Sequence, residues 1–245
     1  MSLTFKKEGL PVAQEGDRII YVNPSDEADG KTTFEEIQSD VKLKPIPRIS
    51  THDRECVLVI GKSGSGKSRY CRVYADQYLK LFPNSVCWIF SKHDKDPAFD
   101  DMKRMHRVNI LHYTDNQDKY PLGTFKDSIV IFDDIDQIYD VKVLNKLYAL
   151  RNDILENGRK LFIYCVITKH LFPTGKADKI LNVECRSIVF FPQGNKAEID
   201  RYLNKQLLLL KRKRNQVTDT MSRWVQFVNE YPEYVLTEDE IFMID

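Results

Sequence analysis

One glycine-rich octapeptide constrains the fold of this chain more than any other feature. Residues Gly61–Ser68 match the pattern G-x-x-x-x-G-K-[ST]. They follow the apolar run Glu55–Ile60 and open the segment Lys67–Phe82, which favours a helix that stops before Pro83. A buried strand that turns through glycines into a helix is the setting in which this pattern binds phosphate groups. The sequence therefore predicts a phosphate-binding loop of the Walker A type.

Each fixed position of this loop has a physical role. Glycines allow a tight turn that aims backbone N–H groups at phosphate oxygens, and the N-terminus of the following helix adds a favourable dipole. We expect Lys67 to neutralise the β- and γ-phosphates of ATP and Ser68 to ligate Mg²⁺. The residues expected to bind the nucleotide are Gly61, Lys62, Ser63, Gly64, Ser65, Gly66, Lys67 and Ser68.

A pair of carboxylates ends a second apolar run, Ser128–Phe132. Asp133 is placed to hold Mg²⁺ as a Walker B aspartate, and Asp134 is placed to orient or deprotonate the attacking water. Turns favour Asp after strands, so this pair is weak evidence alone and becomes strong beside a phosphate loop. The second acid favours ATP hydrolysis over a small-molecule kinase, which must shield its phosphate from water.

Polar and cationic residues near a third apolar run, Leu161–Thr168, are further candidates for the site. Thr168 and His170 are candidates to contact the γ-phosphate or its water, with a histidine in a surface loop as the alternative. A ring-forming ATPase also needs a cation delivered to the γ-phosphate, often as an arginine finger from a neighbouring subunit. Of Arg151 and Arg159 we favour Arg159, because a glycine precedes it in a loop. A helix-end charge or a surface salt bridge is the alternative for either arginine.

Short apolar runs alternate with helical segments from residue 55 onward. This alternation predicts an α/β fold with a parallel sheet flanked by helices, whose ligands bind at the carboxyl ends of the strands. The additional strand 85–90 between the two motifs is typical of P-loop NTPases that carry an extra catalytic acid. The remaining expected elements are helices at 97–105, 141–156 and 196–214, strands at 107–113 and 187–191, and a C-terminal β-hairpin formed by 224–228 and 234–236.

The first fifty residues lack this regularity. We interpret 1–50 as an irregular extension with one short strand at 18–22 and a proline-containing linker at 42–47, followed by an ATPase domain at 51–245. No apolar run approaches the roughly 18 residues that span a bilayer, and the N-terminus lacks the apolar core of a signal peptide. We therefore expect the protein to stay in the compartment where it is made.

The net charge of +1 gives the chain as a whole no strong attraction to a polyanion such as DNA. A nucleic-acid surface must therefore be local. The run Lys211–Arg214 is expected at the end of the helix 196–214, where it complements the helix dipole, contacts DNA phosphates or acts as a nuclear localisation signal. The five cysteines show no metal-binding spacing, and we expect buried, reduced thiols.

The order of these motifs resembles the genome-packaging ATPases of large eukaryotic DNA viruses and virophages, within the FtsK–HerA superfamily. The resemblance covers roughly residues 50–244, and its more specific parts are the GRK segment and the tryptophan-containing tail. Lys160 departs from the family, which often has histidine after the Gly-Arg pair. The matching segments are VLVIGKSGSGKS at 57–68, IVIFDDI at 129–135, LRNDILENGRK at 150–160, VITKH at 166–170, IVFFP at 188–192 and SRWVQFVNEYPEYVLTEDEIFMI at 222–244.

The resemblance implies a motor. Such a motor is a homo-oligomeric ring that hydrolyses ATP with Mg²⁺ and pumps double-stranded DNA into a preformed capsid. We expect it to hold phosphates and to read no base sequence. The resemblance further implies a capsid or portal partner, and a location in the virion or in the host cytoplasm or viral factory, which are reducing surroundings. Residues 1–50 lie outside the match and are a candidate tether to the capsid.

Two other functions remain open from the residues alone. A nucleotide or small-molecule kinase predicts transfer of phosphate to an acceptor with little hydrolysis. A non-hydrolysing, nucleotide-binding virion protein predicts tight ATP binding without turnover, and the substitution Asp134→Asn then changes nothing.

Overall fold

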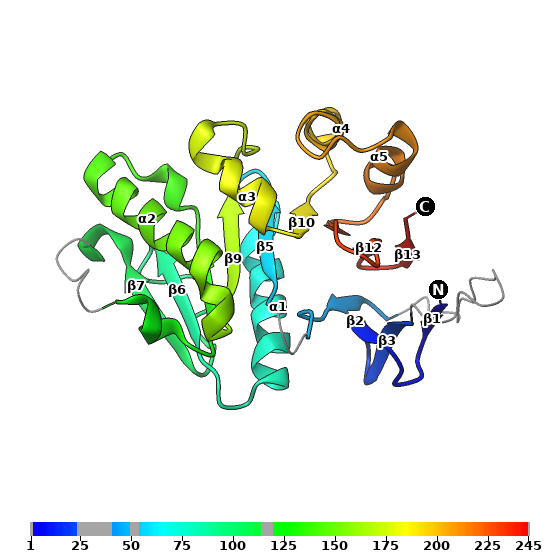
Figure 1. Ribbon diagram of the computed structural model, residues 1–245, viewed down its shortest axis with the longest axis horizontal. Helices are drawn as coiled ribbons and strands as arrows, with labels where there is room; N and C mark the ends of the chain where they lie inside the picture. Colours follow the sequence, from blue (N-terminus) through cyan, green and yellow to red (C-terminus); the bar gives the residue numbers. More distant parts are fainter. Residues whose placement is uncertain (1, 24–40, 50–53, 114–119, 245) are drawn as a thin grey trace. The chain divides into compact units, whose positions relative to one another are not determined.

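The computed structural model describes residues 2–23, 41–49, 54–113 and 120–244 (Figure 1). Two compact units are present. The central unit is Ser50–Arg186, and the terminal unit combines Met1–Ile49 with Ser187–Asp245. Among the described residues, no helix has the length and apolar character needed to cross a membrane.

Five parallel strands form the core of the central unit. In sheet order they are β5 (Cys56–Ile60), β9 (Tyr164–Lys169), β8 (Ile129–Phe132), β6 (Cys87–Ser91) and β7 (Met105–Asn109). Every residue of β5, β8 and β9 is buried, so both faces of these strands are covered. Two-sided burial explains why the corresponding runs are continuously apolar rather than alternating.

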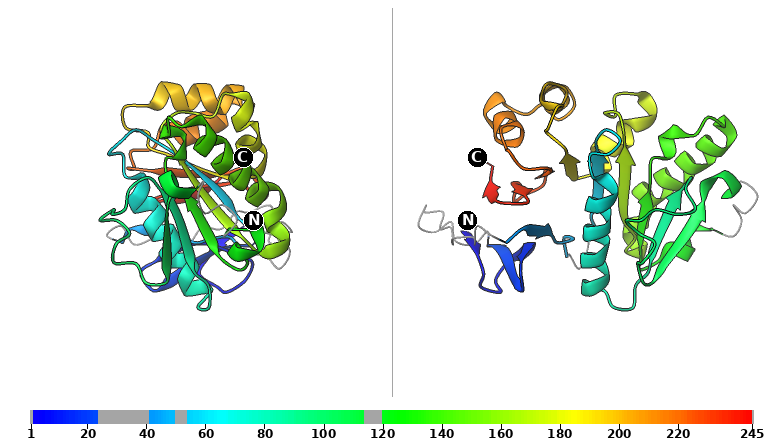
Figure 2. Two further views of the ribbon diagram at one scale, coloured as in Figure 1. Left: turned by 90° about the vertical axis from the view of Figure 1, so that its left-hand side faces the viewer. Right: turned by 180° about the vertical axis from the view of Figure 1, so that it is seen from behind.

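Helices cover both faces of these strands. Figure 1 and Figure 2 show α1 (Lys67–Leu81) on one face, with α2 (Val141–Asn157) and α3 (Lys179–Glu184) on the other. The carboxylate of Asp140 caps α2 by accepting from the N–H groups of Lys142 and Val143, at 2.8 and 3.2 Å. Short 3₁₀ turns connect these elements: η3 (Leu122–Phe125), η4 (Ile135–Gln137), η5 (Gly158–Leu161) and η6 (Lys176–Asp178).

Antiparallel strands make up the terminal unit. One sheet has the order β1 (Ser2–Thr4), β3 (Arg18–Asn23), β2 (Leu10–Glu15) and β4 (Leu43–Pro45). A second set pairs β10 (Ser187–Phe190), β11 (Val225–Val228), β12 (Tyr234–Thr237) and β13 (Ile241–Met243) in sequence. The backbone N–H of Leu43 donates to the carbonyl of Glu238 at 2.8 Å, so the N-terminal segment bonds to the C-terminal tail.

The prediction of an irregular N-terminal extension is wrong. Its short strand at 18–22 is present as β3, but β1, β2 and β4 are present as well. β1 and β4 have only three residues each and pair with strands distant in the sequence, whereas β2 and β3 form a hairpin in which Glu15 lies opposite Arg18. Elements this short carry little periodicity for a sequence reading to detect.

Two predicted helices also differ from the structure. Residues 97–105 form no helix, because they lie mainly in turns and Met105 already begins β7. The single helix expected at 196–214 is instead α4 (Lys196–Lys205) and α5 (Lys211–Thr218). Leu208 lies between them in the left-handed region, at φ 55°, which ends the first helix.

The remaining predicted elements are confirmed within a few residues, including α2 and the C-terminal hairpin β11–β12. All five cysteines are free and buried, as expected. Burial raises the pKa of Cys71, Cys165 and Cys185 well above the ordinary thiol value, which keeps these groups protonated.

Candidate nucleotide site

The phosphate loop joins β5 to α1 at the carboxyl edge of the parallel strands (Figure 1). Gly64 and Gly66 adopt left-handed backbone angles, with φ of 75° and 113°. A side chain at Gly64 would meet no atom within 4 Å, so the positive φ and not crowding is what favours glycine there. The N–H of Gly61 donates to the carbonyl of Lys169 at 3.0 Å, which fixes the start of the loop to β9.

Lys67, the first residue of α1, turns its ammonium back across the loop. Its Nζ donates to the carbonyl of Gly61 at 2.9 Å and lies 3.5 Å from Asp134 Oδ2. The residue is buried, so these contacts replace water around the charge. The ammonium therefore stands between the phosphate loop and the acidic end of β8.

Asp133 follows β8 and is buried. The hydroxyl of Ser91, at the end of β6, lies 3.2 Å from its Oδ2, and the hydroxyl of Thr168, in β9, lies 3.3 Å from its Oδ1. Burial raises the pKa of the Asp133 carboxyl, and the negative charge of Asp134 raises it further, while the two hydroxyls oppose the shift. Ionisation of Asp133 in this buried position therefore costs free energy.

Asp134 has an unusual backbone and three polar neighbours. It adopts φ 46° and ψ 40°, a left-handed conformation that Asp tolerates better than most residues. Its N–H donates to Thr168 Oγ1 at 2.8 Å, and its Oδ1 lies 2.8 Å from the same hydroxyl. His170 Nε2 lies 2.8 Å from Oδ2. The structure thus brings Lys67, Thr168 and His170 together around one carboxylate.

Thr168 connects the two acids. Its hydroxyl has one proton, which can be donated to Asp133 or to Asp134 but not to both at once. The predicted candidates Thr168 and His170 therefore both lie at the acid pair. Their roles in catalysis, like those of Lys67, Ser68 and the acids, stay predictions.

Ser91 is a residue at this site that sequence reasoning missed. A polar residue at the carboxyl end of the strand next to β8 was the available signal. The Ser91 hydroxyl also accepts from the N–H of His93 at 3.2 Å, so it joins Asp133 to the segment that follows β6.

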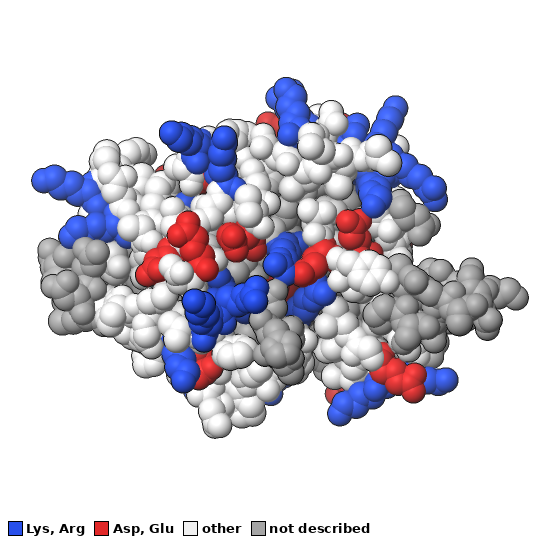
Figure 3. Space-filling model, viewed as in Figure 1, with Lys and Arg blue, Asp and Glu red and all other residues white. Residues whose placement is uncertain are grey.

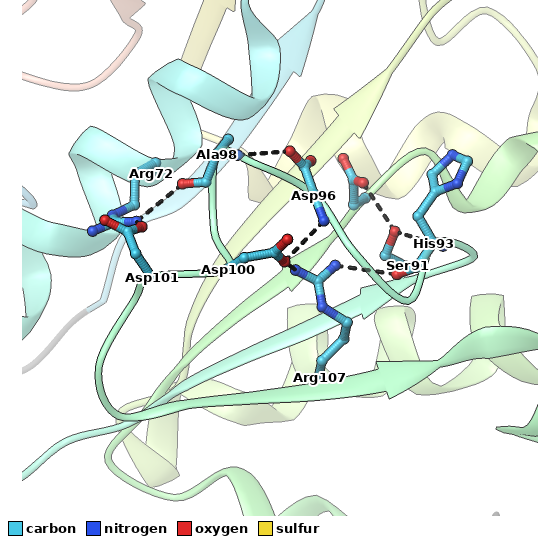
Figure 4. Close-up of polar contacts among 9 residues, drawn as sticks. Arg72, Ser91, His93, Asp96, Ala98, Asp100, Asp101 and Arg107 are labelled. Carbon is cyan, nitrogen blue, oxygen red and sulfur yellow. Dashed lines mark hydrogen bonds and ion pairs between the residues drawn. The ribbon is translucent and has the colours of Figure 1, made fainter.

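Two arginines hold that segment in place (Figure 4). Arg107, from β7, donates to the carbonyl of His93 at 3.1 Å and to the carboxylate of Asp100 at 3.2 Å. Arg72, from α1, donates to the carbonyl of Ala98 at 3.0 Å and forms an ion pair with Asp101. The helix that begins at the phosphate loop is thereby connected to the segment that begins at Ser91.

The two arginine candidates lie elsewhere. Arg159 is exposed in η5, before the first residue of β9, whereas the acid pair lies at the other end of that strand. Six strand residues separate the two ends by roughly 20 Å. Arg151 has a side chain only 1% exposed, donates to the carbonyl of Ala177 at 3.1 Å and pairs with Asp178. The side chain of Arg151 therefore has its partners within its own chain.

The residues present fit a nucleotide with Mg²⁺. Among the described residues, no cluster of three or more His, Cys, Asp or Glu side chains could hold a metal ion. Mg²⁺ needs no such cage, because it is usually held by one or two protein ligands together with phosphates and water. Asp133, with its raised pKa and second carboxylate nearby, is a position where a divalent cation relieves an existing repulsion.

Comparison with known proteins gives one clear relative. The uncharacterized protein V3 of the Sputnik virophage is 33% identical over 223 residues, which cover 89% of this chain and 87% of that protein. No family model matches the chain.

Among solved structures, the genome packaging NTPase B204 from Sulfolobus turreted icosahedral virus 2, in complex with sulfate, is similar at a TM-score of 0.50. The identity is 12%, over 80% of this chain and 98% of B204. Its complex with AMPPCP has a TM-score of 0.49 at 12% identity, over 80% and 99% of the two chains. At this identity the likeness concerns the fold, and the predicted P-loop α/β class is confirmed.

The match to V3, in contrast, extends over nearly nine-tenths of both chains. The expected resemblance to virophage proteins is confirmed, and the chain belongs to the family of Sputnik virophage protein V3.

Proposed function

We propose that this chain is an ATP-hydrolysing motor that moves double-stranded viral DNA into a capsid. The observation that carries the proposal is the position of Asp134. This second carboxylate lies 3.5 Å from Lys67 and 2.8 Å from His170, beside a phosphate loop. A virophage relative and the fold shared with a genome packaging NTPase support the same function.

In the proposed mechanism, the phosphates of ATP lie on the backbone N–H groups of Gly61–Ser68 and at the N-terminus of α1. Lys67 donates to β- and γ-phosphate oxygens. Ser68 and Asp133 would hold Mg²⁺, which supplies neutralisation of the charge that develops on the phosphates. The ordering of Asp133 by Ser91 and Thr168 keeps its carboxylate in place before the ion arrives.

Asp134 is the proposed general base. It accepts a proton from water while the water oxygen bonds to the γ-phosphorus and the bond from that phosphorus to the bridging oxygen breaks, which releases ADP and phosphate. Thr168 and His170 orient the carboxylate through their contacts of 2.8 Å. Lys67 limits the repulsion between Asp134 and the phosphates.

For Arg159 we propose a role in trans. Its exposed side chain lies at the opposite end of β9 from the acid pair, so it reaches a nucleotide only when a neighbouring copy supplies it. A homo-oligomeric ring, with a capsid or portal partner in the virion or the infected cell, is part of the same proposal.

DNA contact is proposed for the start of α5. The prediction that Lys211–Arg214 complements a helix C-terminus is wrong, because this run begins α5 and its cations oppose the helix dipole there. Lys213 and Arg214 are compensated by Glu233 and Asp200. Lys211 and Arg212 are exposed, and Figure 3 shows Lys and Arg side chains gathered over α4 and α5. Exposed cations of this kind suit DNA phosphates.

The decisive experiment measures phosphate release from Mg-ATP by the purified chain, with and without linear double-stranded DNA. Lys67→Ala is the test variant. Lys80→Ala, an exposed position near the far end of the same helix, is the matched control. Turnover that DNA stimulates, and that only Lys67→Ala abolishes, supports the motor.

Other results separate the alternatives. Turnover that is indifferent to DNA supports an ATPase without the translocating role. Bound ATP without turnover supports a kinase, if a phosphate acceptor restores transfer, or a non-hydrolysing virion protein, if none does.

A further inference from the structure

Four charged residues form linked ion pairs beside the acid pair, and the two cations among them are buried. Lys169, in β9, places its Nζ 3.0 Å from Asp178 Oδ2 and 3.4 Å from Asp136 Oδ2. Arg151, in α2, lies 3.6 Å from Asp178 Oδ1. The side chains of the two cations are 5% and 1% exposed, and those of the two acids 16% and 14%. We refer to these four residues as the buried quartet.

The quartet is balanced in charge and enclosed by its neighbours. Two cations face two carboxylates, so the formal charges cancel. Arg151 also donates to the carbonyl of Ala177 at 3.1 Å and lies over the ring of Tyr148, 4.3 Å from its centroid. Replacing a buried ion pair by apolar side chains is often neutral or stabilising, so stability alone does not account for a charged group here.

The location of Lys169 indicates a role at the nucleotide site. Its chain neighbours are Thr168 and His170, which both contact Asp134, and its carbonyl accepts from the N–H of Gly61. Its ammonium reaches Asp136, two residues beyond Asp134. One residue therefore contacts the start of the phosphate loop through its backbone and the loop after β8 through its side chain.

The position of Asp134 depends on its surroundings, because its left-handed backbone is uncommon outside glycine, although Asp tolerates it better than most residues. Contacts on both sides of Asp134 hold it in this conformation. On one side Asp134 bonds to Thr168, and on the other the chain enters η4, which contains Asp136. The pair Lys169–Asp136 connects η4 to β9.

We infer that Lys169 is a positioning residue for Asp134, acting through Asp136 and the rest of the quartet. The inference rests on the proposed ATPase function. The side chain of Lys169 is buried and pairs with Asp136 and Asp178, so we expect no contact with the nucleotide. Its loss should let η4 shift and misplace the Asp134 carboxylate, without changing the loop surface that binds phosphates.

Two variants test this inference. Lys169→Met leaves one buried negative charge in excess and removes the Lys169–Asp136 pair. Lys169→Met combined with Asp136→Asn also removes this pair, but it restores charge balance, because Arg151 and Asp178 still cancel. Lys196→Met is the control, since it breaks an exposed ion pair with Asp219 in the terminal unit. The measurements are kcat for ATP hydrolysis, the Kd of a non-hydrolysable ATP analogue and the melting temperature.

We expect Lys169→Met to lower kcat by about tenfold or more with the analogue Kd within about threefold, the pattern of a lost transition-state interaction. The double variant should regain the melting temperature of the wild type and keep the low kcat. Recovery of kcat together with stability in the double variant would show a purely structural quartet and overturn the inference.

The two proposals fail in different ways. Hydrolysis by the wild type with unchanged kcat in both variants would overturn the positioning role alone. A wild type that binds the analogue and never hydrolyses ATP would overturn the proposed function, and the positioning role with it.

Discussion

The cations paired near the phosphate loop of the central unit are more deeply buried than those paired in α4 and α5 of the terminal unit. In the central unit, the side chains of Lys67, Arg151 and Lys169 are exposed by 7%, 1% and 5%, and each faces a carboxylate. In the terminal unit, Lys196 pairs with Asp219 and Lys213 with Glu233 between side chains that are exposed by at least 24%. A buried charged side chain depends on its partner, whereas an exposed one can replace its partner with water at little cost.

This difference teaches where the function is concentrated. Burying a charge costs hydration energy that a fold recovers only through well-placed partners. The central unit buries several charges near the carboxyl edge of its strands, where the acid pair and the phosphate loop also lie. Buried charges held by specific partners are typical of catalytic sites. The terminal unit has exposed cations at its surface, among them Lys211 and Arg212.

The largest expected effect is on catalysis at the central unit. Asp134→Asn should lower ATP turnover by about 10²–10⁴-fold, because the amide cannot accept the proton from water. Binding of ATP should remain, since Asp134 is not part of the phosphate loop. Steady-state phosphate release and fluorescence titration with a nucleotide analogue measure the two quantities. Turnover close to that of the wild type would point to a non-hydrolytic role or to another base.

Next in size is a stability effect that compares buried and exposed cations directly. Arg151→Leu should lower the free energy of unfolding by about 3–5 kcal/mol, because it leaves an unbalanced buried carboxylate in the quartet. Lys213→Ala, in a half-exposed pair, should cost less than about 1 kcal/mol. Urea unfolding of both variants checks the contrast, and equal losses would break the comparison between the units.

A smaller effect, a gain in stability rather than a loss, is expected from substitution of Asp133. Its folded pKa is raised above the ordinary 3.8, chiefly by burial, so ionisation of this carboxyl disfavours the folded state. Asp133→Asn should therefore raise the melting temperature in the absence of nucleotide, while it removes Mg²⁺-dependent turnover. Each unit of raised pKa corresponds to about 1.4 kcal/mol.

The pH dependence of this gain has a definite sign. Below pH 3.8 the Asp133 carboxyl is protonated in both the folded and the unfolded state. Its ionisation then costs the wild type no stability relative to the variant. As pH rises through the folded pKa, the wild type loses stability relative to Asp133→Asn, and above that pKa the difference is constant. Thermal melts between pH 4 and pH 8 measure it, and a gain that shrinks with rising pH would contradict the assignment.

The smallest expected effect concerns the terminal unit and DNA. The double substitution Lys211→Ala and Arg212→Ala should weaken DNA binding several-fold and reduce the slope of log K against log salt by about two. Lys80→Ala with Lys103→Ala, two exposed cations of the central unit, is the matched control for charge. An unchanged slope would move the DNA surface away from α5.

Much of the candidate site could be predicted from local patterns. Gly61–Ser68, Asp133 and Asp134 stand next to buried strands whose apolar runs are read without knowing their neighbours. Ser91 and Lys169 could not be assigned in the same way. Their importance comes from contacts with Asp133 and Asp136, on another strand and another loop, that no spacing along the chain reveals.

The same division holds for the fold. The sequence by itself determined the phosphate loop, the parallel α/β core and the acid pair, because glycine angles, apolar runs and helix starts act over a few residues. Only the tertiary structure decided that η5 holds Arg159 far from the acid pair of its own chain, that β4 bonds to the C-terminal tail, and that Lys211 begins a helix. These outcomes depend on which distant segments compete for the same hydrogen bonds and the same buried space, and that competition is settled only when the whole chain packs.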